Sequence, residues 1–302
     1  MPRTPERRRK HEYVPSALTR EELISALGQL TDKSRIIAGG TDLMPDLRKK
    51  RPDVDIFLSL SAMEEMKEIR ISDDTICIGA MATHDSIARN AEIKTWATAL
   101  HHACSHVGSQ QIRNRGTIGG SLANASPAGD MIPCVCLLGG TLLLLGADGA
   151  FRRIPAEDFT LGVSRTALHP GEVLFAIELP VRKDRSTAFV KLGSRKEVTI
   201  AQISIAISWD KGTRYQNPDG YLGAVDVTPV HLEEMPELIG QGPVDDAAKD
   251  RLAESLRDRI RGIRMNRKRP PKLKITEAER LYKERAVRSV VYDVFDLAET
   301  ID

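Results

Sequence analysis

The first block of the chain mixes helical and strand patterning. Thr19 and Glu22 have the spacing of a capping box, and the apolar stripe that follows over 23–30 has a helical period, so a helix is predicted there. Apolar residues predict a short strand over 35–38, and apolar residues at every second position predict another over 54–60. We expect these elements to form a first unit at residues 11–65.

Strand patterning resumes after this unit. Alternation predicts a strand over 75–78, and a longer helical segment follows over 92–106. The leucine-rich run and glycines of 142–149 predict a hairpin, and a further strand ends near Pro180. These elements indicate a second unit at residues 66–184.

The last third of the chain has a pattern of its own. Isoleucines alternate with serine and alanine over 203–208, which is typical of a half-solvated antiparallel strand. Apolar stripes of helical period over 248–260 and 282–297 predict two long helices, each packed by one face. We therefore expect a C-terminal domain of antiparallel sheet plus helices at residues 185–302.

Composition narrows the classes of partner. The 302 residues are enough for two or three compact units, and 44 basic against 42 acidic side chains leave a net charge of +2. Nucleic-acid-binding proteins usually carry a basic excess, and single-strand binders rely on aromatic residues, which make up only 4% here. Nucleic acid is therefore not the expected partner. A basic run over 264–274 is either a solvated face or a docking surface for a partner subunit.

Cysteine spacing and hydropathy suggest an ordinary cytoplasmic protein. The four cysteines form no disulfide framework, and Cys134 with Cys136 would be half of a metal site that has no second half nearby. We expect buried free thiols and no metal ligands. Basic residues 7–10 precede no apolar signal segment, and the most apolar run, 134–145, is too short to span a bilayer.

Two glycine-rich turns depart from the patterning of strands and helices. Residues 36–43 read Ile-Ile-Ala-Gly-Gly-Thr-Asp-Leu, and residues 112–130 combine glycines with short hydroxyl and amide side chains and end at Asp130. Because glycine has no side chain to block an approach, we expect backbone amides of both turns to come close to a ligand. The polar side chains of the second turn add hydrogen-bonding groups. Two such turns indicate a large phosphorylated cofactor held at both ends.

Each turn also has a plainer interpretation. A strand, a glycine turn and a helix start make an anion site, because free amides at the helix start point outward. Taken alone, however, Gly39 to Asp42 is more often only a tight turn. Asp42 would repel a pyrophosphate unless it caps the following helix or faces a ribose hydroxyl, and Asp130 is equally well explained as a helix cap. The Gly-x-Gly-x-x-Gly fingerprint is absent, which excludes a Rossmann dinucleotide site.

Taken together, the two motifs resemble the FAD-binding medium subunit of the molybdenum hydroxylases, the family of the xanthine, nicotinate and carbon monoxide dehydrogenase flavin subunits. The resemblance rests on Ala38-Gly39-Gly40-Thr41-Asp42-Leu43 and on the segment from Gly116 to Asp130. It extends over nearly the whole chain through Gly171 to Leu174 and Phe189 to Arg195. It implies an α+β fold, with a two-part FAD-binding domain of the vanillyl-alcohol-oxidase (PCMH) type followed by the C-terminal domain.

The resemblance also implies cofactor-binding positions. The first turn would wrap the pyrophosphate, and a second wall would come from the glycine-rich helix start. Val107 would pack on the flavin, Asp130 would bind a ribityl or ribose hydroxyl, and Leu174 and Lys191 would approach the ring. A cation such as Lys191 beside the pyrimidine edge would stabilise the charge of a reduced flavin. The implied residues are Ile36, Ile37, Ala38, Gly39, Gly40, Thr41, Asp42, Val107, Thr117, Gly120, Asn124, Asp130, Leu174 and Lys191.

The implied function is electron transfer within a complex. The chain would take electrons from two [2Fe-2S] clusters of a small partner subunit and pass them through FAD to NAD, a quinone or another acceptor. A large partner subunit would hold the molybdenum cofactor, in what would be a dimer of heterotrimers. No side chain of this chain would then be catalytic, and His84, His101, His102 and His106 would be structural. Thr199 would lie near the flavin edge.

The chain departs from the family pattern in two places. Members that reduce 4-hydroxybenzoyl-CoA hold an iron–sulfur cluster in a cysteine-rich insertion, which the segment from Asn124 to Cys136 lacks. Ser121 stands where the family often has asparagine. Two other functions remain open from the sequence: a stand-alone flavin oxidoreductase of the same fold, and an assembly factor of this fold without FAD.

Overall fold

The computed structural model describes the chain apart from residues 1–11, 15–16, 196–197, 240–243, 267–276 and 302. The basic N-terminal residues 7–10 lie outside the described residues, as does the basic run of 264–274 beyond the helical backbone of 264–266. Within the described part, no helix is both long enough and apolar enough to cross a bilayer.

A small parallel sheet of order β1-β3-β2 forms the N-terminal part. Parallel neighbours need a crossover, and helices supply it after the first and second strands. Thr19 caps α1 as predicted, since its Oγ1 accepts a hydrogen bond from the Glu22 amide at 3.2 Å. The Glu22 carboxylate accepts from the Leu18 amide at 2.7 Å, one residue before the Thr19 amide that a capping box uses. The elements are β1 Glu12–Val14, α1 Arg20–Leu27, β2 Arg35–Ile37, α2 Leu43–Lys50 and β3 Ile56–Ser59.

The second sheet is antiparallel, with five strands in the order β4-β5-β10-β6-β7. Its central strand, β10, is almost entirely buried because both neighbouring strands and two layers of side chains cover it. The predicted hairpin is present between β6 and β7, and Gly149 takes the positive φ of 79° that its turn requires. The elements are η1 Glu64–Lys67, β4 Ile69–Ile71, β5 Thr75–Gly79, β6 Thr141–Leu145, β7 Phe151–Pro155, α9 Ala156–Phe159 and β10 Val173–Pro180. Between α9 and β10, β8 Thr160–Gly162 and β9 Arg165–Thr166 pair as a separate two-stranded sheet, which is not counted among the three larger sheets.

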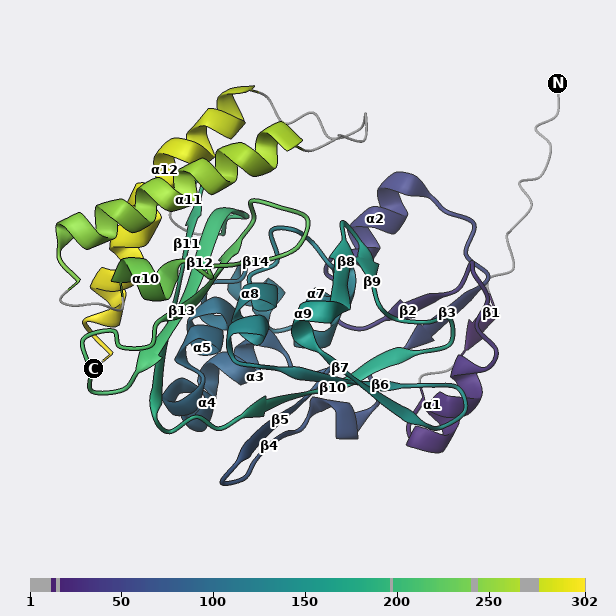
Figure 1. Cartoon of the computed structure of the whole chain (residues 1–302). Helices are drawn as coiled ribbons and strands as arrows, with labels where there is room; N and C mark the ends of the chain where they lie inside the picture. The colour runs from purple at the N-terminus through teal and green to yellow at the C-terminus, as the bar shows by residue number, and fades with distance from the viewer. Residues whose placement is uncertain (1–11, 15–16, 196–197, 240–243, 267–276, 302) are drawn as a thin grey trace, which may run out of the picture.

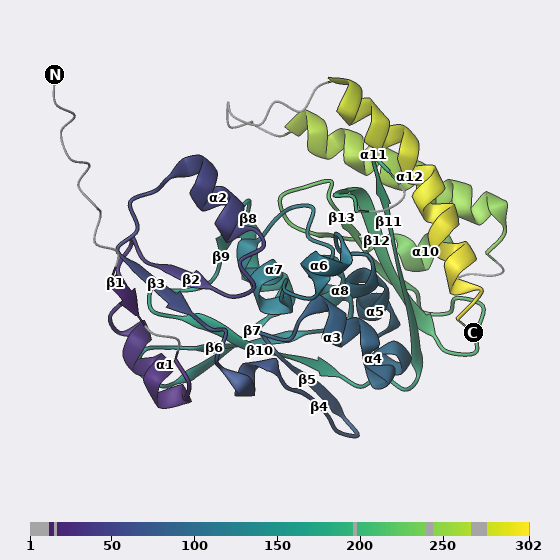
Figure 2. The same cartoon turned by 180° about the vertical axis from the view of Figure 1, so that it is seen from behind.

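A layer of short helices lies between the second and third sheets (Figures 1 and 2). The single helix predicted over 92–106 is wrong: the helix breaks at Ala97, whose φ and ψ are −139° and 52°. The reason is tertiary, because the first-turn amide of Ala99 donates to Thr187 Oγ1 of the third sheet at 3.0 Å. The helices are α3 His84–Arg89, α4 Ala91–Trp96, α5 Thr98–Ser105, α6 Gln110–Arg113, α7 Ile118–Asn124 and α8 Met131–Leu137.

The third sheet, of order β11-β12-β13-β14, is covered on both faces. The last two long helices lie on one face, and α5 and α8 pack on the other. The half-solvated strand predicted over 203–208 is therefore wrong, since Ser204 and Ser208 of β12 are buried as well as the isoleucines. The elements are β11 Arg185–Gly193, β12 Ala201–Asp210, β13 Asp219–Gly223, β14 Val230–His231, α10 Met235–Ile239, α11 Asp246–Asn266 and α12 Glu277–Ala298.

Two apolar cores organise these layers. One is continuous beneath the first and second sheets and the short helices, so a domain boundary between residues 65 and 66 stays a prediction. The other lies between the third sheet and α11 and α12. The predicted stripe of α11 is buried there, and so are Val290 and Val294 of α12, but Tyr282 at the start of that helix is 44% exposed.

Candidate cofactor site

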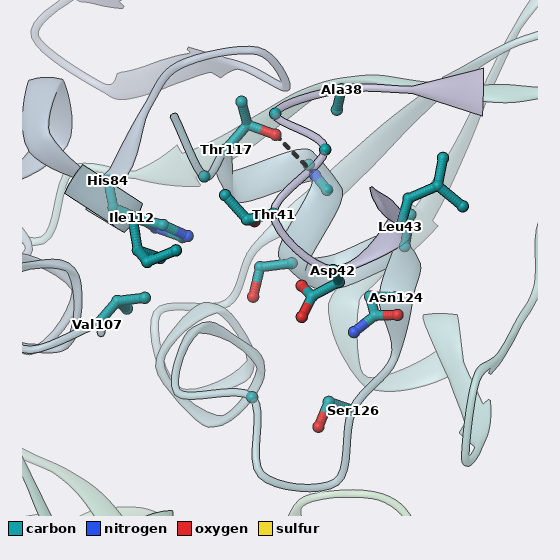
Figure 3. Close-up of a pocket in the computed structure, with 18 of the residues that line it drawn as sticks. Ala38, Thr41, Asp42, Leu43, His84, Val107, Ile112, Thr117, Asn124 and Ser126 are labelled. Atoms are coloured by element: carbon teal, nitrogen blue, oxygen red, sulfur yellow. Dashed lines mark hydrogen bonds between the residues drawn. The ribbon is translucent and has the colours of Figure 1, made fainter. Parts of the chain in front are cut away.

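A cavity of about 610 Å³ opens where the three sheets and the short helices meet, a size within the usual range of ligand pockets. Its walls come from the turn between β2 and α2, the turn after β5, helix α7, the start of α8, the segment before β10, and the facing ends of β11 and β12. In Figure 3, His84, Val107 and Ile112 lie on one side of it, Asn124 and Ser126 lie on the other, and the turn of Ala38 to Leu43 lies between them.

The structure brings the expected cofactor-binding positions to this one cavity, with a single exception. Ile37 does not line it, because successive residues of β2 point to opposite faces and Ile36 takes the inward position. The expected residues in the wall are Ile36, Ala38, Gly39, Gly40, Thr41, Asp42, Val107, Thr117, Gly120, Asn124, Asp130, Leu174 and Lys191.

The first glycine turn presents unused backbone donors. Among the described residues, the amides of Gly39, Gly40, Thr41 and Asp42 have no acceptor, whereas the amide of Met44 donates to the Gly40 carbonyl as α2 begins. Gly40 has a positive φ of 73°, the left-handed conformation that occurs in anion-binding nests. This turn has the arrangement needed to hold a phosphate group.

In the second glycine turn, the amides at the start of α7 are not free in this way. The amides that begin α7 are used within the protein: Ile118 donates to Ala82 O, Gly119 to Ala80 O, and Gly120 to Thr117 Oγ1 at 3.1 Å, the bond drawn in Figure 3. This turn therefore offers side chains such as Asn124 and Ser126 to a ligand rather than its helix-start amides.

Glycine is required in these turns mainly because segments of the backbone pack directly against each other. A Cβ on Gly39 would lie 1.9 Å from the carbonyl oxygen of Arg115, and one on Gly119 would lie 2.5 Å from Ala80 Cβ. The two glycine turns thus lie back to back, with backbone touching backbone. Their shared contact fixes the cavity wall before any ligand binds.

Asp42 faces the cavity without capping a helix. Its side chain makes no capping bond to α2, which removes one of the two explanations for a carboxylate beside a phosphate site. Burial raises the pKa of Asp42, and the neighbouring Asp46 raises it further, so its negative charge is disfavoured. The remaining explanation, a bond to a ribose hydroxyl, agrees with its position in the wall.

Asp130 and Lys191 form a buried ion pair across the cavity floor. Lys191 Nζ lies 2.5 Å from Asp130 Oδ2, and the two side chains are 9% and 7% exposed. Lys191 is therefore a cation compensated by Asp130, and its expected place beside the flavin stays a prediction. Asp130 does not cap α8, and its Oδ1 is buried with no hydrogen-bond partner. Burial raises the pKa of Asp130, while Lys191 opposes that rise.

These groups fit a flavin dinucleotide. Free amides at 39–42 match a pyrophosphate, and the orphaned Asp130 Oδ1 needs a donor such as a sugar or ribityl hydroxyl. Val107, Ile112 and Leu174 give the apolar surface that a flat ring system requires. No group of three or more His, Cys, Asp or Glu side chains is placed to hold a metal ion in the part of the chain that the structure describes.

Several wall residues were missed from the sequence. Ala80 and Met81 follow β5, where Gly79 packs so tightly on Met66 that a Cβ would lie 2.2 Å from its carbonyl oxygen. His84 was expected to be structural only, yet it lines the cavity. Glu172, within the family segment from Gly171 to Leu174, also lines the cavity, although the sequence indicated no role for it. In the sequence, the pointer to this part of the wall was the position of Gly79 to His84, directly after the strand predicted over 75–78.

Comparisons with known proteins identify the family of this chain. Residues 10–182 match the family described as the FAD-binding domain in molybdopterin dehydrogenase. This chain belongs to that family. It follows that the predicted resemblance, the FAD cofactor and the class of oxidoreductase subunit are confirmed.

Relatives of the family are named as subunits of dehydrogenases. The chain is 32% identical to the glyceraldehyde dehydrogenase medium chain of Sulfolobus acidocaldarius, over 79% of this chain and 86% of the relative. It is 31% identical to the nicotinate dehydrogenase FAD-subunit of Eubacterium barkeri over 94% of both chains. A chain of CO dehydrogenase from Oligotropha carboxidovorans shares the fold, with a TM-score of 0.83 at 23% identity and coverage of 97% and 98%. The predicted α+β fold of the FAD-binding (PCMH) type is thus confirmed.

Proposed function

We propose that this chain is the flavin electron-transfer subunit of a cytoplasmic molybdenum hydroxylase complex. It would receive electrons from [2Fe-2S] clusters on a small partner subunit, while a large partner subunit oxidises the substrate at its molybdenum cofactor. NAD, a quinone or another acceptor would take the electrons onward. The observation that carries the proposal is the convergence of four free amides and a buried, orphaned carboxylate oxygen on one cavity.

The chain's own residues bind and orient the cofactor. The amides of the first turn would hold the pyrophosphate, and the side chains of Asp42 and Asp130 would accept hydrogen bonds from hydroxyl groups. Val107 and Leu174 would exclude water from the ring. When bound, FAD supplies the chemistry of taking up and releasing electrons. The Asp130–Lys191 pair keeps the cavity floor close to neutral, so the protein adds little net charge there.

The test is an absorption spectrum of the chain purified with its natural partners, before and after acid release of cofactor. We expect flavin bands near ~450 nm and FAD released in about equal amount to the chain, with iron confined to other subunits. A colourless chain within an intact complex would overturn the proposal in favour of an assembly factor. A yellow chain that turns over substrate alone would instead support a self-contained oxidoreductase.

A further inference from the structure

His84 is a buried histidine in the cavity wall that the proposed function leaves without a role. It is the first residue of α3 and is 3% exposed, and Figure 3 shows its ring beside Ile112 and Val107. Its amide donates to the Gly116 carbonyl at 3.0 Å. A Cβ on Gly116 would lie only 3.0 Å from the His84 ring carbon Cδ2. The ring is therefore held in one place under the second glycine turn.

The two ring nitrogens have different surroundings. Nδ1 lies 3.8 Å from the sulfur of Cys104, a fully buried residue of α5. At Nε2, no protein group within the described residues makes a hydrogen bond. One nitrogen is thus occupied by a thiol, and the other is left for whatever fills the cavity.

The thiol of Cys104 can set the position of the imidazole proton. Burial raises the pKa of Cys104, so the sulfur keeps its hydrogen. That hydrogen has two acceptors within reach, His84 Nδ1 and, at 3.4 Å, the thioether sulfur of Met131. An imidazole nitrogen is the stronger acceptor of the two. When Nδ1 accepts, the ring proton must sit on Nε2 and face the cavity.

The ring is also held uncharged. Burial, together with the positive charges of Arg113 on α6 and Lys191 on β11, lowers the pKa of His84 to about 4. The thiol of Cys104 also packs against it, and Lys191 is itself paired with Asp130. At neutral pH, His84 therefore offers a single neutral N–H donor.

We infer that His84 is a cofactor-binding residue whose Nε2–H donates a hydrogen bond to the flavin end of FAD, and that Cys104 is the positioning residue that aims it. The acceptor would be a carbonyl oxygen or an unprotonated nitrogen of the ring system. This inference rests on the proposed function. It is favoured by the neighbours of His84, because the apolar side chains of Val107 and Ile112 provide the flat-ring environment on that side of the cavity.

The first test compares His84→Leu with the wild-type full chain. Loss of one hydrogen bond is expected to weaken FAD binding about three- to tenfold in a fluorescence titration, and to lower the midpoint potential of the bound flavin because the reduced ring is the better acceptor. His102→Leu is the matched control: its pKa is also lowered to about 4 by burial, but it does not line the cavity. It should change neither quantity.

The second test reads the tautomer directly. In the ¹⁵N-histidine-labelled full chain, His84 should carry its proton on Nε2, and the Nε2 resonance should move when FAD is added. In Cys104→Ala, both tautomers should be populated and FAD binding should weaken in the same direction. The ¹⁵N measurement also tests the role of His84 if His84→Leu does not fold.

The outcomes separate this inference from the proposed function. A chain that binds FAD but whose affinity and potential are unchanged in His84→Leu would overturn the role of His84 and leave the flavin function standing. A wild-type proton on Nδ1 would do the same. A wild-type chain that takes up no FAD would overturn both.

Discussion

At the scale of single residues, the site depends on positions where no atom can be added. Gly39 touches the carbonyl of Arg115, and Gly119 touches Ala80. From the sequence, these glycines were expected to let a ligand come close. The structure shows that they also let another backbone segment of the same chain pack against them. His84 gave no comparable signal, since a lone histidine beside an apolar face is usually structural, and only the fold brings its ring to the cavity.

Replacement of Gly39 by alanine should damage the wall of the cavity. The new Cβ would overlap the carbonyl oxygen of Arg115, so the turn must shift, at a cost of about 1–3 kcal/mol in the free energy of unfolding. FAD affinity should fall at least about tenfold because the donor amides of 39–42 move with the turn. Thermal unfolding and a flavin titration measure the two effects.

Gly262→Ala is the control for this change. Gly262 lies within α11, and a Cβ there would meet nothing within 4 Å. Alanine should stabilise that helix by up to about 1 kcal/mol and leave FAD binding as it was. Equal FAD affinity in Gly39→Ala and Gly262→Ala would contradict the assignment of the first turn.

At the scale of elements, tertiary contacts override local pattern in two places. The helix over 92–106 breaks at Ala97 because the third sheet takes an amide of α5. Strand β12 is buried on both faces because α5 and α8 cover the side that alternation assigned to solvent. Capping, the hairpin and the amphipathic helices, which depend on neighbours in sequence, were predicted correctly.

The segment that leads into β10 is held over the cavity by Glu172. Its carboxylate accepts hydrogen bonds from Arg152 Nε at 2.9 Å, from Arg152 Nη2 at 2.6 Å and from the His169 amide at 2.7 Å. The Arg152 hydrogen bonds are the main cause that lowers the pKa of Glu172 below its ordinary value of 4.5. Leu168 and Leu174, on either side, line the cavity.

Glu172→Gln should lower the free energy of unfolding by about 1–2 kcal/mol at pH 7, since it removes a charge-assisted pair. A carboxyl whose pKa is lowered by folding stabilises the protein above its ordinary pKa and loses that contribution at lower pH. The difference in free energy of unfolding between wild type and variant should therefore be largest at pH 7 and shrink as the pH falls below 4.5. Urea unfolding across this pH range measures it.

The neighbouring pair Arg153–Glu178 supplies the control, because it joins the same region of the second sheet but does not line the cavity. Glu178→Gln should leave FAD affinity unchanged, whereas Glu172→Gln should weaken it. A gap for Glu172→Gln that stays constant down to pH 3 would contradict the proposed ionisation.

At the scale of the whole molecule, the cavity lies where the first core meets the third sheet, whose residues contribute to both cores. Asp130 begins α8, whose residues belong to the first core, and Lys191 comes from β11 of the third sheet. Their ion pair is buried at the junction. The cofactor site is therefore complete only when both cores are folded and docked, a relation between distant segments that pattern along the chain could not reveal.

Lys191→Met should destabilise the chain by about 3 kcal/mol because it leaves the Asp130 carboxylate buried and uncompensated. Adding Asp130→Asn in the double variant should recover part of this loss. Lys33→Met, in the exposed pair with Asp53, should cost less than about 1 kcal/mol. Urea unfolding of wild type, Lys191→Met, Asp130→Asn and the double variant gives the coupling energy of the pair. Additive effects of the two single substitutions would show that the pair does not act as a unit.

The junction also bears on when the protein can acquire its cofactor during synthesis. Both glycine turns lie in the first 130 residues, so a growing chain completes the phosphate-binding side of the cavity early. The facing wall, with Lys191 and Ala201, is translated later and belongs to strands that need α11 and α12 for their own core. Until β11 has been made and packed, Asp130 lacks its counter-ion and the cavity lacks a floor. We therefore expect cofactor loading to be a late event in the life of each new chain.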